Sequence, residues 1–332
     1  MKKAIVCLLV VVLMFSLVAC SNNAQNAKTE SEPKKEELKY PEKPINVIVA
    51  YKAGGGTDVG ARILCSEAEK ILGQPLVIIN KPGADGELGY TELCKSPPDG
   101  YTIGFINLPT FVNLYLERKT EFDKNSITPI LNHVYDPGVL VVKSNSPFET
   151  LEQFVDYAKA HPEEITISNN GTGASNHIGA AHFAKLADIK VTHVPFGGSA
   201  DMLAALRGDH VMATVAKISE VAALVKNGEL RILASYTEER LEDFPDVPTM
   251  REKGYDVLFG SARALVGPKG IPQEIADKLH DSFKKALESP SHIEKAKNAD
   301  LPIKYMSPQE LMDYIEKEEA YLKEIVPQLD LN

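Results

Sequence analysis

The 332-residue sequence lacks both glycine-rich motifs by which proteins commonly bind nucleotides. It contains no Gly-Lys pair, so it cannot form a phosphate-binding P-loop. The run Gly54-Gly55-Gly56 does not continue into G-x-G-x-x-G, because the last position of that pattern is Val59. The three glycines nevertheless leave backbone amides accessible between a strand-like and a helical pattern. This junction gives no support to a nucleotide site and favours a small anion.

Cysteine is scarce, with four in the whole chain. There is no Cys-x-x-Cys and no Cys/His cluster at the spacing typical of zinc sites, so we expect no metal and no cofactor. Cys65 and Cys94 each fall on the apolar side of a helical pattern, which predicts buried thiols. An extracytoplasmic location would also permit a disulfide between them, and the sequence leaves that alternative open.

Positive charge is in deficit, with 36 Lys and Arg against 46 Asp and Glu and a net charge of −10. Nucleic acid is therefore not expected as a partner. About 290 residues follow the tether, which is enough for two lobes, each with its own core.

No nucleophile elbow is present, because neither Ser175 nor Ser199 is followed by x-Gly. His177 and His182 do not form H-E-x-x-H, and a helix-face role is the commoner one for such histidines. We therefore expect no enzyme. A hydrolase that uses Ser175, His177 and Asp58 is kept as the weakest alternative.

The N-terminus carries the one apolar run that could be a targeting segment, Ala4 to Leu17, which is too short to span a bilayer. It follows Lys2 and Lys3 and ends in "LVAC", a pattern that resembles a bacterial lipobox, with Cys20 as the lipidated residue. An ordinary signal peptide with a chance cysteine is the alternative. We assign residues 1–19 to the signal peptide and 20–40 to a polar flexible tether, whose lipid would anchor the protein outside the membrane. Cleavage would change the net charge from −10 to −12, because it removes two lysines and no acid.

Strand-like and helical patterns alternate from Pro44 onward, which predicts an α/β fold with doubly wound parallel sheets. The predicted strands are 45–50, 75–80, 101–107, 139–143, 165–169, 191–196, 211–215, 230–236 and 262–267. The predicted helices are 57–72, 87–95, 151–160, 176–187, 200–207, 218–227, 273–288 and 308–326. Four strand-to-helix junctions are rich in glycine: 54–56, 80–89, 169–177 and 195–199. Such junctions lie at the carboxyl edge of a parallel sheet, where ligands bind, so we expect them to line a cleft.

Several segments together resemble the substrate-binding proteins of tripartite tricarboxylate transporters, also called the Bug family. They are "VAYKAGGGTDVGAR", "NKPGADGELG", "PPDGYTIGF", "GTGASNH", "VPFGGSADMLAALRGDHVMA", "LRILASYTEERLEDFPDVPTMREKGY" and "ALVGPKGIP". The resemblance covers Pro44 to Leu329 in order. It implies a periplasmic-binding-protein type II fold with two doubly wound lobes and a ligand cleft between them. Lobe one would comprise residues 41–137 and 260–332, and lobe two residues 138–259.

The family implies a small carboxylate ligand, such as a di- or tricarboxylate, gripped by the amides and hydroxyls of two loops. In this chain the loops are 53–58 and 171–177, and the implied ligand-binding residues are Gly55, Gly56, Thr57, Thr172, Gly173, Ala174 and Ser175. Two departures from the usual family pattern are Ala53 in place of proline and Asp85 in place of the first glycine of a pair. The implied partners are the integral subunits of a membrane transporter, and we expect a monomer.

Other residues have two possible roles. Asp58 is favoured in the first turn of a helix by the helix dipole, a structural role that competes with ligand contact. Ser175 could cap the following helix instead of binding ligand. Tyr51, Phe196 and the pair Tyr135-Asp136 are expected as cleft walls or as core residues near the hinge. Lys52 is expected as a rim residue or as a cation that faces the ligand. The sequence does not separate transport from a role as a lipoprotein that signals ligand binding to a membrane sensor kinase.

Overall fold

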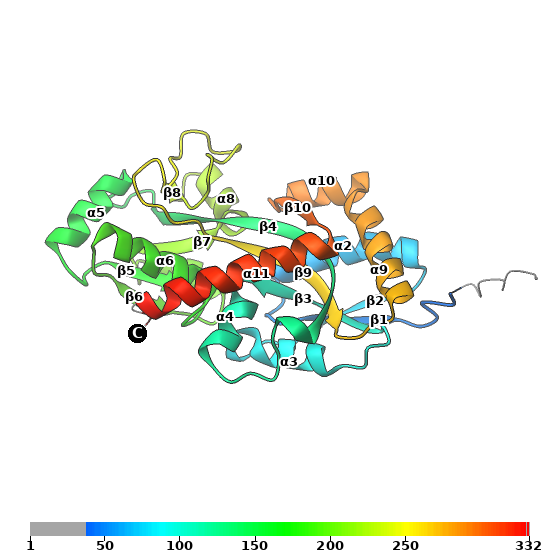
Figure 1. Ribbon diagram of the computed structural model, residues 1–332. Coiled ribbons are helices and arrows are strands. Elements are labelled where there is room, and N and C mark those ends of the chain that lie inside the picture. Colours follow the sequence, from blue (N-terminus) through cyan, green and yellow to red (C-terminus); the bar gives the residue numbers. More distant parts are fainter. Residues whose placement is uncertain (1–37, 330, 332) are drawn as a thin grey trace, which may run out of the picture. The chain divides into compact units, whose positions relative to one another are not determined.

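The computed structural model describes residues 38–329 and 331 of the chain (Figure 1). Residues Tyr40–Asn332 form one compact unit. The predicted signal peptide, Cys20 and nearly all of the predicted tether lie outside the described residues. None of the helices in the described range is long and apolar enough to cross a membrane.

The unit alternates strands and helices through most of its length. The strands are β1 (Ile45–Val49), β2 (Leu76–Asn80), β3 (Thr102–Leu108), β4 (Ile127–Lys143), β5 (Thr166–Asn169), β6 (Thr192–Pro195), β7 (Ala213–Lys217), β8 (Leu230–Ser235), β9 (Gly260–Pro268) and β10 (Ile303–Met306). The helices are α2 (Gly56–Leu72), α3 (Glu87–Lys95), α4 (Thr110–Glu117), α5 (Leu151–Ala160), α6 (Ser175–Ala187), α7 (Ser199–Arg207), α8 (Ile218–Lys226), α9 (Gln273–Leu287), α10 (Pro290–Asn298) and α11 (Pro308–Ile325). Short 3₁₀ turns occupy Ala84–Gly86, Lys124–Ser126 and Val326–Gln328.

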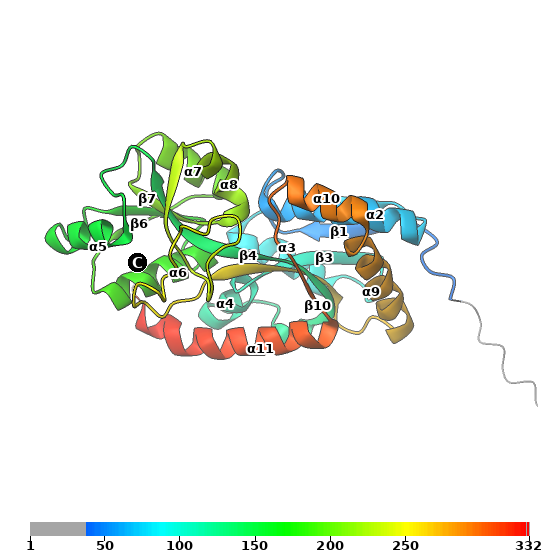
Figure 2. The same ribbon diagram turned by 90° about the horizontal axis from the view of Figure 1, so that it is seen from above.

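One long strand, β4, connects the two halves of the sheet. The strand order is β2-β1-β3-β9-β4-β7-β5-β6, with β8 and β10 also paired to β4. From Ile127 to Pro137 the strand pairs with β9, and from Gly138 to Lys143 it pairs with β7 and β8. Figure 2 shows β4 running from the elements β1–β3 on one side to β5–β7 on the other. Strands β1, β2 and β3 are parallel to one another, and so are β5, β6 and β7. The pairs that involve β4, β8, β9 or β10 are antiparallel.

Helices cover both faces of each half of the sheet. Successive residues of a strand point to opposite faces, so Val47 packs beneath α2 and α9 whereas Ile48 packs toward α3, α4 and α11. In the same way Leu140 belongs to the core with α5 and α6, and Val141 to the core with α7 and α8. Burial on both faces explains why these strands read as continuous apolar runs. The doubly wound α/β arrangement predicted from the sequence is observed.

The sequence patterns missed four pieces of this arrangement. Helix α4 and helix α10 were not predicted, nor was strand β10, and β4 extends twelve residues further toward the N-terminus than the predicted strand. The first part of β4 contains Asn132, His133, Asp136 and Pro137, which break the apolar pattern used to find strands. Both cysteines are free thiols: Cys65 is buried, as the apolar spacing predicted, whereas Cys94 is only partly buried. Burial raises the pKa of the Cys94 thiol to about 12.

Two glycines mark the place where the chain crosses between the halves. A Cβ atom on Gly138 would overlap the ring of Phe259, and one on Gly260 would lie 2.5 Å from Cζ of Tyr135. The amide of Gly138 donates to the carbonyl of Phe259 at 2.9 Å, which closes the gap between the two crossing segments. Only glycine leaves room there for the two aromatic rings to pack against the backbone.

A buried histidine pair lies beneath α2. Nε2 of His133 on β4 and Nε2 of His292 on α10 are 2.8 Å apart, and both side chains are fully buried. One ring must donate and the other accept, so at least one of them is neutral. Burial, with the neighbouring ring and Arg263, holds the pKa of His133 well below its ordinary value, and burial also lowers that of His292.

This pair predicts a loss of stability in acid. The folded state disfavours protonation of both rings, because both pKa values are lowered, whereas the unfolded chain takes up protons as the pH falls through about 6.5. This contribution to stability is therefore complete above that pH and falls below it. Each such histidine contributes a slope of about 1.4 kcal/mol per pH unit. We expect the free energy of unfolding, measured with urea between about pH 6.5 and 5, to fall less steeply in His292→Gln than in the wild type. The difference in slope should correspond to about one bound proton. The exposed His210→Gln is the control, and an unchanged slope in His292→Gln contradicts the prediction.

Candidate functional site

All four glycine-rich junctions predicted from the sequence line one cleft, with a volume of about 700 Å³. The lining residues from these junctions are Lys52 to Thr57, Pro82 to Gly86, Asn170 with Ala174 and Ser175, and Gly197 to Asp201. Each junction follows a strand and leads toward a helix, so the helix N-termini converge on the same space. The amides that begin a helix have no carbonyl partner within it and carry partial positive charge. The cleft is therefore suited to an anion.

The first loop is held in shape by Asp58. Its carboxylate accepts hydrogen bonds from the amide of Gly54, from Nε and Nη2 of Arg62, and from Nδ2 of Asn80, all at 2.9–3.0 Å. Burial alone would raise the pKa of Asp58, but these hydrogen bonds outweigh it and keep the pKa below its ordinary value. Asp58 does not line the cleft. It therefore has the structural role that the helix position favoured, and it fixes Gly54 in a left-handed conformation with φ of 82°.

Gly56, the first residue of α2, lies against the guanidinium of Arg263. A Cβ atom at this position would be 2.6 Å from Nη2 of Arg263. The guanidinium is 3% exposed and forms an ion pair with the fully buried Asp136 of β4 at 2.5 Å. Asp136 also accepts hydrogen bonds from the amide and the hydroxyl of Ser219, at the start of α8. The absence of a side chain at Gly56 thus brings a buried cation to the start of α2.

The second loop contributes fewer of its predicted residues. Ala174 and Ser175 line the cleft at the start of α6, whereas Thr172 is exposed and, like Gly173, does not line it. The amide of Gly173 donates to Nδ1 of His177 at 3.1 Å, and its carbonyl accepts from Asn113 at 2.9 Å. Gly173 therefore does not offer the free amide that we expected of it.

The two predicted aromatic walls differ. Tyr51 lines the cleft, and its hydroxyl lies 2.9 Å from that of Tyr90. Burial raises the pKa of Tyr51 to about 12, so its hydroxyl is neutral near pH 7. Phe196 does not line the cleft and packs against the core with α7 and α8. The hydroxyl of Thr57 is paired with the side chain of Asn107, which the sequence analysis did not single out.

The most strongly charged parts of the cleft were missed from sequence. Arg263 and Lys217 line it and are 3% and 5% exposed, and Glu220 lies beside them. Two signals pointed to them. Arg263 interrupts the apolar pattern of a predicted buried strand, and Lys217 follows a parallel strand at its carboxyl end, where ligand sites lie. Within the described residues there is no cluster of His, Cys, Asp and Glu able to hold a metal ion.

Contacts across the mouth of the cleft join its two sides. Lys52 is mostly exposed, at 69%, and lies 3.9 Å from Asp201, so it occupies the rim. Asp85 approaches Gly171 so closely that a Cβ atom on the glycine would overlap its Oδ1 atom. The carboxylate of Asp85 is also paired with Arg118 at 3.1 Å. The loops on the two sides of the cleft are thus already in contact.

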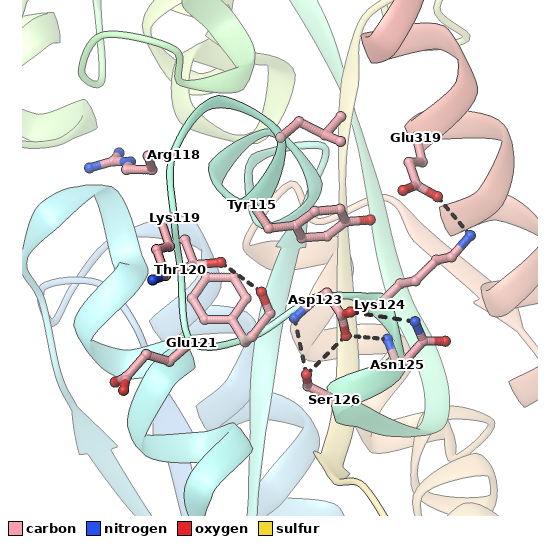
Figure 3. A pocket seen from close by; sticks show the side chains of 12 residues that line it. Tyr115, Arg118, Lys119, Thr120, Glu121, Asp123, Lys124, Asn125, Ser126 and Glu319 are labelled. Atoms are coloured by element: carbon pink, nitrogen blue, oxygen red, sulfur yellow. Dashed lines mark hydrogen bonds and ion pairs between the residues drawn. The ribbon is translucent and has the colours of Figure 1, made fainter.

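A second concavity, of about 600 Å³, lies beside α4 and α11 (Figure 3). Its polar side chains mostly satisfy one another: Asp123 accepts from Asn125 and Ser126, and Lys124 pairs with Glu319 at 2.7 Å. Thr120 donates to the carbonyl of Phe122. This surface has no glycine-rich loop or helix start like those that line the cleft.

A family model described as the tripartite tricarboxylate transporter family receptor, TctC, matches residues 60–331. The chain belongs to this family. A UPF0065 protein of Cupriavidus necator is 34% identical over 291 residues, which cover 86% of this chain and 89% of the relative. The structure of MatC from Rhodopseudomonas palustris with bound malate is 26% identical, covers 86% of this chain and 100% of its own, and superposes with a TM-score of 0.80. An R. palustris protein with adipate is also 26% identical, covers 87% and 97%, and has a TM-score of 0.80.

Membership of the TctC family confirms the expected fold. The two halves of the sheet, with their flanking helices, constitute the two lobes of a type II periplasmic binding protein. Strands β4 and β9 connect these lobes. The cleft of the TctC-family chain is the space between the carboxyl ends of the strands of these lobes.

The close approach of Gly56 to Arg263 predicts a specific intolerance to a methyl group. In Gly56→Ala the new Cβ atom must displace a guanidinium that Asp136 holds in place, so we expect a loss of about 1–3 kcal/mol in the free energy of unfolding. Gly55→Ala is the matched control, because its Cβ atom would meet only the carbonyl of Lys52 at an ordinary 3.5 Å. Urea unfolding of the two variants measures the difference. Equal stabilities would contradict the account.

Proposed function

We propose that this protein is an extracytoplasmic solute-binding receptor that captures a small carboxylate and delivers it to a tripartite tricarboxylate-type transporter. The observation that carries the proposal is the convergence of the starts of α2 and α6, with their unpaired amides, on one cleft. Family membership supports the transport role, and two relatives were solved with the dicarboxylates malate and adipate. The expected ligand is thus a di- or tricarboxylate or a related organic acid.

In this proposal one carboxylate of the ligand lies between the starts of α2 and α6. Gly55, Gly56 and Thr57 would bind it from one lobe, and Ala174 and Ser175 from the other. Helix N-termini favour anions because of their unpaired amides and the helix dipole. Tyr51 would form part of the wall that fits the ligand's carbon skeleton.

Capture would occur by closure of the two lobes. We propose lobe boundaries at residues 137/138, where β4 changes its pairing from β9 to β7 and β8, and at 259/260, where β9 begins. Lobe one is then 41–137 with 260–332, and lobe two is 138–259. Rotation at this crossing would separate Lys52 from Asp201 and Asp85 from Gly171 in the open form, and the closed form would be recognised by the integral transporter subunits.

The receptor needs no catalytic group. In the hydrolase alternative His177 would be the base, yet its Nδ1 accepts from the amide of Gly173 and the side chain is 2% exposed. His177 does not line the cleft, which supports binding without a reaction. We also propose that the protein acts as a monomer that is held at the membrane by a lipid on Cys20.

The carboxylate proposal predicts that ligand charge decides binding. A thermal-shift screen of organic acids should select carboxylates, and a ligand at 100 times its dissociation constant should add about 2.7 kcal/mol to stability. The amide of the same compound should lose most of this shift, because charge-assisted hydrogen bonds are about twice as strong as neutral ones. A protein that responds to neutral sugars or cationic peptides and ignores every carboxylate would remove the proposed function.

The proposed anchor predicts a change of compartment without a change of fold. Replacement of Cys20 by serine removes the lipid-bearing thiol but no residue of the described core, which begins at Tyr40. Cell fractionation should recover Cys20→Ser in the soluble fraction with an unaltered melting temperature. Retention of this variant in the membrane would contradict lipidation at Cys20.

A further inference from the structure

Two buried cations reach the cleft from different strands. Arg263 comes from β9 and Lys217 from the end of β7, and both side chains are at least 95% buried. Neither belongs to the two glycine-rich loops. Because a buried charge is stable only when it is paired or hydrogen-bonded, each of the two requires a partner.

The partner of Arg263 is Asp136, but it occupies only one nitrogen of the guanidinium. Nη2 binds the carboxylate, and Nε and Nη1 have no hydrogen-bond partner among the residues that the structure describes. The charge of Arg263 is thus balanced, while N–H donors beside the cleft are left over. Leaving such donors unsatisfied costs about 1–3 kcal/mol each, which a ligand oxygen would recover.

Lys217 has no partner of this kind. Its ammonium forms no ion pair and no hydrogen bond with any described residue, and lies 5.5 Å from the centroid of the Phe259 ring. The nearby carboxylate of Glu220 is occupied by the hydroxyl of Ser199 at 2.5 Å and by the amide of Lys217 itself at 3.0 Å. Burial lowers the pKa of the Lys217 amine, and the nearby carboxylates of Glu220 and Asp136 oppose this shift only in part. The N–H donors of the Lys217 ammonium therefore have no direct acceptor among the described residues that line the cleft.

We propose that Lys217, with the free N–H groups of Arg263, binds a second carboxylate of the ligand and makes the cleft selective for ligands with two carboxylates. This inference rests on the proposed function, in which the first carboxylate lies at the starts of α2 and α6. A ligand with one carboxylate fills only that place and leaves Lys217 unpaired. Lys217 is then the residue that determines specificity, and Asp136 is the residue that positions Arg263.

The test compares dicarboxylates with their monoamides. Succinate, malate, glutarate and adipate are titrated calorimetrically into the wild-type protein, and the tightest binder is compared with its monoamide, which keeps the length but has one charge fewer. We expect the dicarboxylate to bind at least tenfold more tightly. Lys217→Met should weaken the dicarboxylate at least tenfold and change the monoamide less than threefold, so that the preference disappears.

Three variants separate specificity from folding. Lys217→Arg retains the charge and should retain a preference for the dicarboxylate. Lys159→Met removes an exposed lysine of α5, which has no recorded ion pair or hydrogen bond to other described residues, and should bind like the wild type. Lys217→Met should melt at the same or a higher temperature without ligand, because it removes a buried cation that lacks a partner.

The outcomes distinguish this inference from the proposed function. If the wild type binds none of a panel that also includes monocarboxylates, the proposed function fails and the inference fails with it. If the wild type binds monocarboxylates as tightly as dicarboxylates, or Lys217→Met retains the dicarboxylate preference, only the inference is overturned. Equal weakening of dicarboxylate and monoamide in a folded Lys217→Met also overturns it, because Lys217 would then bind the carboxylate that both share.

Discussion

The buried ion pair between Asp136 and Arg263 is the interaction on which the arrangement of the cleft depends. Asp136 lies on β4, the strand that runs through both halves of the sheet, and Arg263 lies on the neighbouring β9. Asp136 accepts a hydrogen bond from Ser219 at the start of α8, and Arg263 lies against Gly56 at the start of α2. Burying two charges is expensive, and a pair of this kind is tolerated only when its remaining donors and acceptors are satisfied. Asp136 meets this condition with three donors, whereas Arg263, which lines the cleft, keeps two nitrogens without a partner among the described residues.

The glycine-rich loops of the cleft present backbone to it rather than large side chains. Gly54, Gly56 and Gly171 each occupy a position where a Cβ atom would strain the chain or overlap a neighbour. Their absence of side chains lets helix starts and loops from both sides approach the same space. Amide dipoles act over a few ångströms, while the field of the net charge is screened within about 8 Å at physiological salt. A chain with a net charge of −10 can therefore bind an anion in this cleft.

The sequence predicted the fold and the loops of the site because both depend on patterns among residues that are close in the chain. Apolar runs predicted the strands, which are buried on both faces. The glycines that follow these runs predicted the four junctions that line the cleft. It failed where a contact joins distant residues: Asp136 and Arg263 are 127 positions apart, and nothing local to either reveals the pair. Strand β10 was missed because it is defined by its pairing with the distant Asn132 and Val134 of β4 rather than by a local apolar pattern. Gly173 shows the converse limit, since its amide looked available in the sequence but is used by His177 four residues later.

The contacts across the mouth are too weak to hold the two sides of the cleft together by themselves. Lys52 and Asp201 are both mostly exposed and 3.9 Å apart, and such pairs contribute about 0–1 kcal/mol. The hydrogen bond from Asn113 to Gly173 adds about 1 kcal/mol more. Hydrogen bonds to a charged group are worth about 1.5–3 kcal/mol each, and a ligand that touches both lobes makes several of them only in the closed form. Because a ligand shifts a two-state equilibrium by its difference in affinity for the two states, the bound carboxylate, rather than the rim, would determine how much of the receptor is closed.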